Sequence, residues 1–140
     1  MDIKIYDYLH DDSVYIRTDV FVKEQGFVDE FDDMEKKCKH IVVYDENKPI
    51  GNCRFYKKTD DVYAVGRFAV LKAYRGKKIG SLIMEKAEQY IFAEGGKEVV
   101  LGAQVRVKEF YMKLGYMEEG EEFLEEGCPH ITMRKKLKKK

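Results

Sequence analysis

The sequence has no tryptophan, only two prolines and only three cysteines in its 140 residues. So little proline, together with 44% hydrophobic and 37% charged residues, is typical of a compact globular chain and argues against a disordered one. Cys38, Cys53 and Cys128 are too sparse for a disulfide framework, so we expect reduced thiols and a cytoplasmic location. Residues 1–140 have the length of one domain.

Long apolar runs and a net charge are also absent. No run approaches the roughly 20 apolar residues that cross a bilayer, and the N-terminal "MDIKIYDYLHDD" lacks the pattern of a secretory signal. The 26 basic and 26 acidic residues cancel, which gives no general attraction to nucleic acid. We therefore expect neither a membrane nor a nucleic-acid partner, and we interpret the basic "RKKLKKK" as a solvated C-terminal tail.

Apolar residues recur at two kinds of spacing, which predict both strands and helices. Alternating or continuous apolar runs predict strands over residues 3–8, 40–45, 50–57, 62–71, 97–103 and 128–135, with one optional further strand near the C-terminus. Spacings of three and four predict helices over residues 12–24, 76–93 and 105–114. This order predicts an α/β (α+β) fold, a mixed sheet with helices on its faces.

Three local signals add detail to this expectation. Asp11 or Asp12 should cap the first helix, because a carboxylate there accepts from free backbone N–H groups. The residues "ENKP", 46–49, predict a hairpin loop between antiparallel strands. Gly66, inside an apolar strand, indicates a bulge or a close approach by another group.

The most informative stretch is "AYRGKKIGSLIMEKAEQY", where a turn runs into an amphipathic helix. A helix N-terminus offers unpaired N–H groups and a partial positive charge, and glycine lets a phosphate come close to them. Gly76 and Gly80 flank Lys77 and Lys78 here, with Arg75 in front. The pattern suits a pyrophosphate-bearing ligand, although it is neither a Walker loop nor a G-x-G-x-x-G motif. Taken alone, an ordinary basic helix start explains the stretch about as well.

A second motif about thirty residues further on resolves this ambiguity. The turn resembles the Arg/Gln-x-x-Gly-x-Gly/Ala signature of the GNAT superfamily of acyl-CoA N-acetyltransferases, with Lys78 at the middle glycine. "EFYMKLGY", residues 109–116, is similar to the family's later helix "FYxKLGF". The blocks "VFVKEQGF", "HIVVYD" and "GCPHITM" look like the ElaA/YjcF-like branch. The resemblance covers nearly the whole chain and implies the GNAT fold, a mostly antiparallel central sheet with helices on both faces.

The resemblance implies acetyl-CoA as co-substrate. It implies that strand 67–71 diverges from its neighbour so that its backbone pairs with the pantetheine arm; the residues alone favour a fully paired core strand. Either Lys78 points its side chain to solvent or to the phosphate, or its Cβ hinders binding. The resemblance assigns cofactor contacts to Phe68, Ala69, Val70, Arg75, Gly76, Lys77, Lys78, Ile79, Gly80, Ser81, Gln104, Phe110 and Tyr111.

The implied reaction is direct attack of a primary amine on acetyl-CoA in a ternary complex, which needs a base and an acid. Tyr111 matches the family tyrosine near the thioester sulfur and is our expected acid; its alternative is a core tyrosine. Glu30 and His40 are catalytic candidates for the base, with Glu24 also considered, because they fall on the family's acceptor side. A structural histidine is the more common role for a residue placed like His40.

The acceptor side is expected to include Glu24, Phe27, Arg67 and His130. Arg67 could bind an acidic group of the substrate or pair with a buried carboxylate. The segments "VFVKEQGFVDEFDD" and "EEFLEEGC" are acidic, which favours a cationic acceptor, but acidity kept for solubility explains them equally well. The acceptor is expected to be a small-molecule amine or a peptide, and a homodimer is a fair default.

Other functions stay open on the sequence alone. The same fold could serve as a non-catalytic acyl-CoA binding or sensing module, or as a peptide-modifying enzyme. Cys38 with His40, and Cys128 with His130, could together hold zinc if their strands were adjacent, but the spacing fits no common zinc pattern and we expect no metal. Cys128 beside His130 leaves a covalent route marginally open.

Overall fold

A computed structural model describes residues 1–28 and 30–138. Its strands form one seven-stranded sheet in the order β1-β2-β3-β4-β5-β7-β6, in which the β4–β5 pair is parallel and the other neighbouring pairs are antiparallel. The strands are β1 (Asp2–Tyr6), β2 (Lys39–Asp45), β3 (Lys48–Lys57), β4 (Val62–Val70), β5 (Glu98–Gln104), β6 (Met117–Glu125) and β7 (Cys128–Lys136). The helices are α1 (Asp11–Arg17), the π-helix η1 (Thr18–Glu24), α2 (Ile79–Ala93), α3 (Lys108–Lys113) and the 3-10 turns η2 (Asp33–Lys37), η3 (Lys72–Tyr74) and η4 (Val105–Val107).

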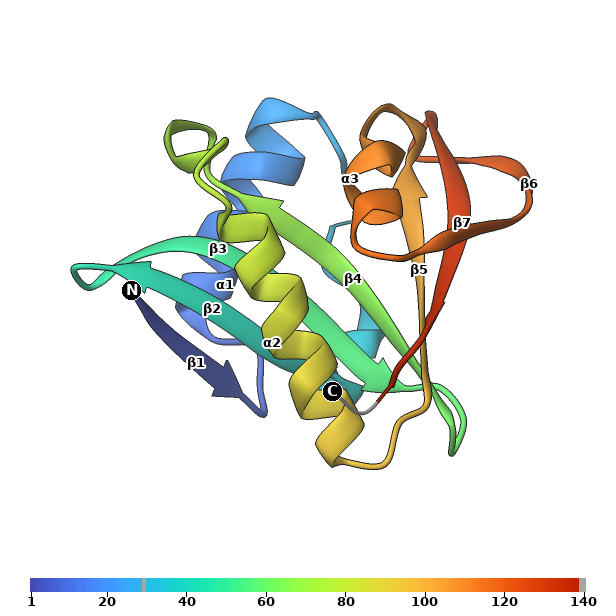
Figure 1. The fold of residues 1–140 in the computed structure, drawn as a ribbon. Coiled ribbons are helices and arrows are strands. Elements are labelled where there is room, and N and C mark those ends of the chain that lie inside the picture. The colour runs from blue at the N-terminus through green and yellow to red at the C-terminus, as the bar shows by residue number, and fades with distance from the viewer. Residues whose placement is uncertain (29, 139–140) are drawn as a thin grey trace.

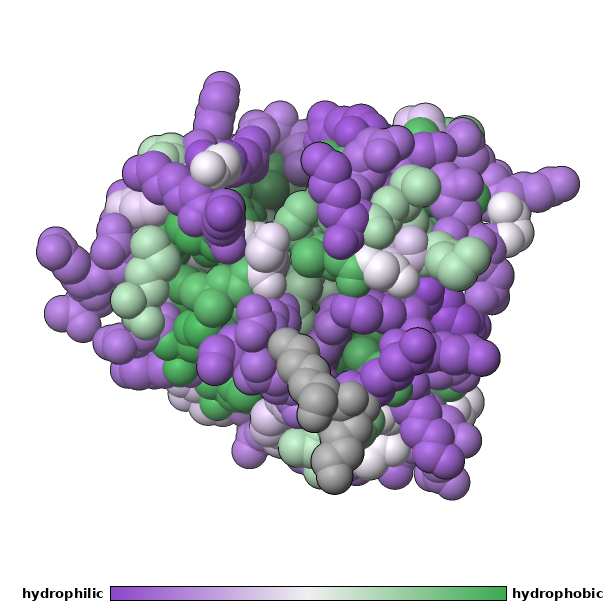
Figure 2. Space-filling view, viewed as in Figure 1, coloured by the Kyte–Doolittle hydropathy of each residue, from purple (hydrophilic) through white to green (hydrophobic). Residues whose placement is uncertain are grey.

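Helices cover both faces of this sheet, as Figure 1 shows with α2 in front of the strands and α1 behind them. Ile79, Ile83, Ala87 and Ile91 recur every four residues on α2 and bury one side of that helix in the larger core. A smaller core lies under α1 and η1 on the opposite face. Charged side chains cover much of the face seen in Figure 2, in keeping with the composition. The predicted mixed sheet with helices on both faces is confirmed.

The β2–β3 hairpin is tighter than predicted. Its loop consists of Glu46 and Asn47, whose φ angles of 47° and 71° match the two left-handed residues of a type I′ turn. Lys48 and Pro49 already pair with β2, so the expected four-residue loop was too long.

The first helix differs from its prediction at both ends. Its N-cap is His10, whose Nδ1 accepts from the Asp12 N–H at 3.0 Å, so neither aspartate is the cap. The α-helix ends at Arg17 and the chain widens into η1, where Gln25 N–H donates to Val20 O at 3.1 Å. Such a widened turn is rare and occurs often at functional sites.

The two later helices begin after their predicted starts. Helix α2 starts at Ile79, because Gly76 and Lys78 have φ angles of 81° and 64° that no helix tolerates. In place of one helix over residues 105–114, the chain forms the 3-10 turn η4 and then the short α3.

The C-terminal region carries two further corrections. The acidic segment interpreted as a substrate-side loop is the edge strand β6, which is exposed along its whole length. Part of the expected basic tail belongs to β7, and Leu137 packs against the larger core. Lys139 and Lys140 lie outside the described residues.

Candidate active site

The site begins where two parallel strands separate. Strand β4 pairs with β5 only from Val62 to Ala64, opposite Glu98 to Val100. Beyond that point β4 continues along β3 and β5 continues along β7. An open cleft of about 1570 Å³ lies between the two diverging strands. The splayed strand implied by the family resemblance is thus present, and the fully paired alternative is wrong.

A β-bulge turns the exposed part of β4 toward this cleft. Asn52 pairs with Ala69 and Arg54 pairs with Gly66, so β4 holds one residue more than β3 between these pairs. Arg67 carries the bulge in a left-handed conformation with a φ of 52°, and Asn52 Nδ2 donates to its carbonyl at 3.1 Å. A bulge was expected at Gly66, and the structure has one at the next residue, Arg67.

The predicted phosphate turn forms the upper end of the cleft. Lys78, at the position of the family's middle glycine, adopts the left-handed conformation that glycine reaches without cost. An L-residue there costs roughly 1–2 kcal/mol. The Lys78 side chain is exposed and places a positive charge next to the first turn of α2. The strained left-handed backbone is the energetic cost of having lysine in place of glycine.

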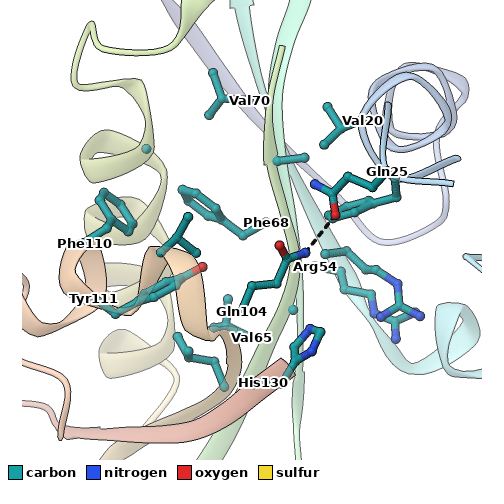
Figure 3. Close-up of a pocket in the computed structure, with 18 of the residues that line it drawn as sticks. Val20, Gln25, Arg54, Val65, Phe68, Val70, Gln104, Phe110, Tyr111 and His130 are labelled. Atoms are coloured by element: carbon teal, nitrogen blue, oxygen red, sulfur yellow. Dashed lines mark hydrogen bonds between the residues drawn. The ribbon is translucent and has the colours of Figure 1, made fainter. Parts of the chain in front are cut away.

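Gly80 has a different role from the one its motif suggests. A Cβ at this position would stand 2.8 Å from Phe68 Cζ and 3.1 Å from Phe110 Cζ. The two rings lie 5.4 Å apart between α2 and the cleft (Figure 3). Gly80 is therefore required by the packing of α2 on these rings.

We expect Gly80→Ala to destabilise the fold by about 1 kcal/mol in urea denaturation, because the rings must move to admit the new methyl group. Helix propensity alone would make alanine better by about 1 kcal/mol, so the sign of the change is diagnostic. Gly66→Ala is the control, since a Cβ there meets no atom within 4 Å. A stabilised Gly80→Ala protein would contradict the packing role.

Arg75 and Glu24 neutralise each other beside the turn. The Arg75 guanidinium donates to both Glu24 oxygens at 2.8 Å, and its Nε donates to Val70 O at 2.9 Å. These hydrogen bonds hold the pKa of Glu24 below its usual value. Glu24 is therefore poorly suited as a base, and Arg75 serves to join η1 to the end of β4.

Tyr111 lies in the aromatic wall of the cleft. Its ring contacts Phe110 at 5.0 Å, Phe68 at 5.9 Å and Tyr116 at 6.0 Å between centroids. Figure 3 shows its hydroxyl directed into the cleft, and within the described chain this hydroxyl makes no hydrogen bond. Burial raises the pKa of Tyr111, so the phenol keeps its proton at neutral pH. An O–H that faces the cleft without a partner in the described chain is a free donor.

Glu30 lies on the opposite side, beneath η1. Arg17 Nε donates to its Oε2 at 2.8 Å, and Arg67 Nε lies 3.3 Å from the same oxygen. Burial raises the pKa of Glu30, and the hydrogen bond from Arg17 offsets this in part. Arg67 therefore pairs with buried carboxylates, which was one of its two expected roles.

Glu30 and Arg67 belong to a larger buried network of ions. Arg54 donates to Asp32 at 2.8 Å and lies 3.0 Å from Glu35, which also accepts two hydrogen bonds from Arg17. Burial raises the pKa of Glu35, but the hydrogen bonds and charges of Arg17 and Arg54 outweigh it and leave the pKa lowered. The network fixes residues 30–37 on the sheet beside the cleft.

His40 lies outside the cleft. It is fully buried on β2, neither ring nitrogen has a hydrogen-bond partner among the described residues, and burial lowers its pKa. His40 does not line the cleft, and its Nε2 lies 3.9 Å from Glu35 Oε1 in the ion network beside it. The structure therefore gives His40 no direct contact with a bound substrate.

The floor of the cleft is polar. Gln104 Nε2 donates to Gln25 Oε1 at 2.8 Å, and Arg106 Nε donates to Gln104 Oε1 at 2.9 Å. His130 stands opposite Gln104 in the β5–β7 pairing and stacks on Phe123. Figure 3 shows Tyr111 and His130 reaching the cleft from different sides, with Gln104 between them.

The cleft brings together most of the residues expected from the sequence. Lys77 and His40 do not line it, whereas the other predicted contacts do: Glu24, Phe27, Glu30, Arg67, Phe68, Ala69, Val70, Arg75, Gly76, Lys78, Ile79, Gly80, Ser81, Gln104, Phe110, Tyr111 and His130. Lining residues that sequence reasoning missed include Arg54, Tyr56, Arg106 and Thr132, whereas Gln25, Phe123 and Glu125 lie in the two acidic segments expected on the acceptor side. Arg54 and Tyr56 share one face of β3, a period-two signal that could have indicated them.

The zinc alternative fails on topology. The strands that carry His40 and His130, β2 and β7, are separated in the sheet by β3, β4 and β5. The two Cys–His pairs therefore cannot share one ion. No group of three or more potential metal ligands occurs in the described ranges 1–28 and 30–138.

The splayed strands, the bulge and the turn at α2 define an acyltransferase. The model of the acetyltransferase (GNAT) domain family matches residues 11–137. A crystal structure from Lactobacillus plantarum assigned as an N-acetyltransferase superposes with a TM-score of 0.90 at 27% identity, over 97% of both chains. The chain therefore belongs to the GNAT acetyltransferase family, as the sequence resemblance predicted.

Its relatives include YjcF and ElaA, the two proteins after which the expected ElaA/YjcF-like branch is named. The uncharacterized N-acetyltransferase YjcF of Bacillus subtilis is 40% identical over 127 residues, which cover 89% of this chain and 90% of YjcF. Protein ElaA of Escherichia coli is 33% identical over 128 residues, which cover 87% of this chain and 84% of ElaA. None of the helices in the described part of the chain is long and apolar enough to span a membrane.

Proposed function

We propose that residues 1–140 form one domain that binds acetyl-CoA in the cleft and transfers its acetyl group to a primary amine by direct attack in a ternary complex. The observation that carries this is the separation of β4 from β5, which leaves the backbone of residues 65–70 facing the cleft. An extended acyl-CoA arm can pair with such a strand edge. The coenzyme supplies the activated thioester.

The upper end of the cleft fits a pyrophosphate. Gly76, Lys78, Ile79 and Gly80 line it at the start of α2, where backbone N–H groups are free and the helix end is positive. The bulge at Arg67–Phe68 is the point where a backbone amide could polarise a thioester carbonyl. Tyr111 would hold a proton for the leaving sulfur.

The acidic segments alone do not show that the acceptor amine must be a polycation. In the first segment Glu24 pairs with Arg75, Glu30 with Arg17 and Asp32 with Arg54, so much of its charge is already neutralised. We therefore propose a small-molecule or peptide amine without restriction to polycations. A homodimer and a cytoplasmic location stay predictions.

We expect isothermal titration to show micromolar binding of acetyl-CoA, and Lys77→Glu/Lys78→Glu to raise its Kd at least about tenfold at low salt, because two cations at a helix N-terminus become anions. Lys86→Glu/Lys113→Glu is the matched control, since both lysines are exposed and neither lines the cleft. Equal weakening in both variants would show a general charge effect.

Thiol release should then be measured with wild-type protein, acetyl-CoA and a panel of primary amines and lysine-bearing peptides. Turnover with an amine supports the enzyme. Tight binding without turnover on any member of the panel would favour the acyl-CoA sensing module, and no binding would overturn the proposed site.

A further inference from the structure

We propose that His130 is the general base, and that it removes the proton from the acceptor amine through Nε2. This inference rests on the proposed function, because it gives the proton of the attacking amine a destination. Three of the carboxylates that line the cleft are paired with arginines: Glu24 with Arg75, Glu30 with Arg17, and Asp32 with Arg54. A fourth, Glu125, lies beside His130 itself. His130 is a titratable cleft residue without a cationic partner in the described structure.

The tautomer of His130 is set by the backbone. Its Nδ1 lies 2.7 Å from the carbonyl oxygen of Cys128. A carbonyl can only accept, so Nδ1 must carry the hydrogen, and the neutral ring then has its lone pair on Nε2. Phe123 stacks on the ring at 5.8 Å with planes 27° apart, which holds the orientation. The base is therefore preorganised.

A carboxylate lies next to that nitrogen. Glu125 Oε2 lies 3.5 Å from Nε2, so its carboxylate would pair with the imidazolium that forms. His130 as a whole residue is 5% exposed, which limits competition from water. Tyr56, Lys58, Arg106 and Glu126 are further titratable or charged residues of the cleft lining.

The proton balance of the step is complete. An alkylammonium with a pKa near 10.4 is neutral only about once in 2,500 molecules at pH 7. His130 Nε2 takes one proton, and the freed nitrogen lone pair forms the N–C bond to the acetyl carbon as the C–S bond breaks. Tyr111 gives its proton to the departing sulfur and regains one from the new amide nitrogen. His130 returns the first proton to solvent.

The first test does not depend on turnover. The chain contains three histidines, His10, His40 and His130, so long-range ¹H–¹⁵N spectra at pH 8 can be assigned with His130→Gln and His10→Gln. We expect the neutral ring of His130 to carry its hydrogen on Nδ1. A hydrogen on Nε2 would overturn the proposal.

The second test is kinetic. For every amine that turns over, His130→Gln and His130→Asn should lower kcat/KM at least about 100-fold and remove the acidic limb of its pH profile, while the Kd of acetyl-CoA changes less than twofold. Asparagine keeps a donor near the Cys128 carbonyl, and His10→Gln, outside the cleft, should match the wild type. Unchanged kcat/KM in both His130 variants would overturn the base and leave the proposed function standing. An inactive wild type that binds acetyl-CoA would overturn both.

Discussion

Arg17→Met is expected to lower the free energy of unfolding by about 3–5 kcal/mol, the cost of removing one partner from a buried ion network. Arg17 has no solvent-exposed surface. Its guanidinium donates to Glu30 Oε2 at 2.8 Å, to Glu30 O at 3.0 Å and to Glu35 Oε1 at 3.0 Å. Methionine fills similar space but removes one of the two cations beside each carboxylate, so that Glu30 keeps only Arg67 and Glu35 keeps only Arg54. The poorly compensated desolvation of these carboxylates is the main loss.

Urea denaturation measures this cost, and Arg134→Met is the matched control. Arg134 also forms an ion pair, with Glu119 at 2.7 Å, but its side chain is 32% exposed. An exposed pair contributes at most about 1 kcal/mol. Similar losses in the two variants would mean that the buried network contributes no more than a surface pair.

The pH dependence of the difference gives a second check on Arg17. In the wild type, Glu35 has a lowered pKa and so contributes stability that is lost as the pH falls through that pKa. Without Arg17, burial raises the pKa of both Glu30 and Glu35, so the folded variant binds protons that the unfolded chain does not. The stability difference between wild type and variant should therefore shrink as the pH falls from 7 to 5. A difference independent of pH would exclude the charge mechanism.

Arg17 also explains why the first helix was hard to predict. The buried residues of α1 and η1 are Ser13, Ile16, Arg17, Val20 and Phe21, a regular helical spacing of three and four. Two of the five are polar, so the apolar pattern looked ragged although the buried face is continuous. The partners that make Arg17 tolerable come from residues 30–35, which no local pattern connects to it.

The two sides of the cleft differ in how far the sequence could define them. Most of the proposed cofactor side follows one stretch, residues 67–81; its residues indicated the turn, and the family resemblance implied the splayed strand. The acceptor side is assembled from η1, β3, β6 and β7, whose approach depends on sheet order. Strand β6 was predicted only as an optional strand without bounds, because it is exposed on both faces and so lacks alternation.

Tyr111→Phe should lower kcat at least about tenfold with little change in acetyl-CoA affinity, because the hydroxyl is needed only when charge develops on sulfur. The loss should be confined to turnover, since that hydroxyl has no hydrogen bond to break within the described chain and lines the cleft. Folding stability should stay within about 0.5 kcal/mol of the wild type. An unchanged kcat would exclude the tyrosine as the acid.

Tyr116→Phe is the control that separates catalysis from packing. The two rings lie 6.0 Å apart, but the Tyr116 hydroxyl donates to Glu88 Oε2 at 2.9 Å and does not line the cleft. Its removal leaves the half-buried carboxylate of Glu88 short of a donor, so Tyr116→Phe should lose about 1 kcal/mol of stability and keep its kcat. Each variant thus removes the phenolic oxygen of one of two neighbouring tyrosines. The Tyr111 variant should lose kcat and keep its stability, and the Tyr116 variant should lose stability and keep its kcat. If both lost stability and neither lost turnover, Tyr111 would be a core residue.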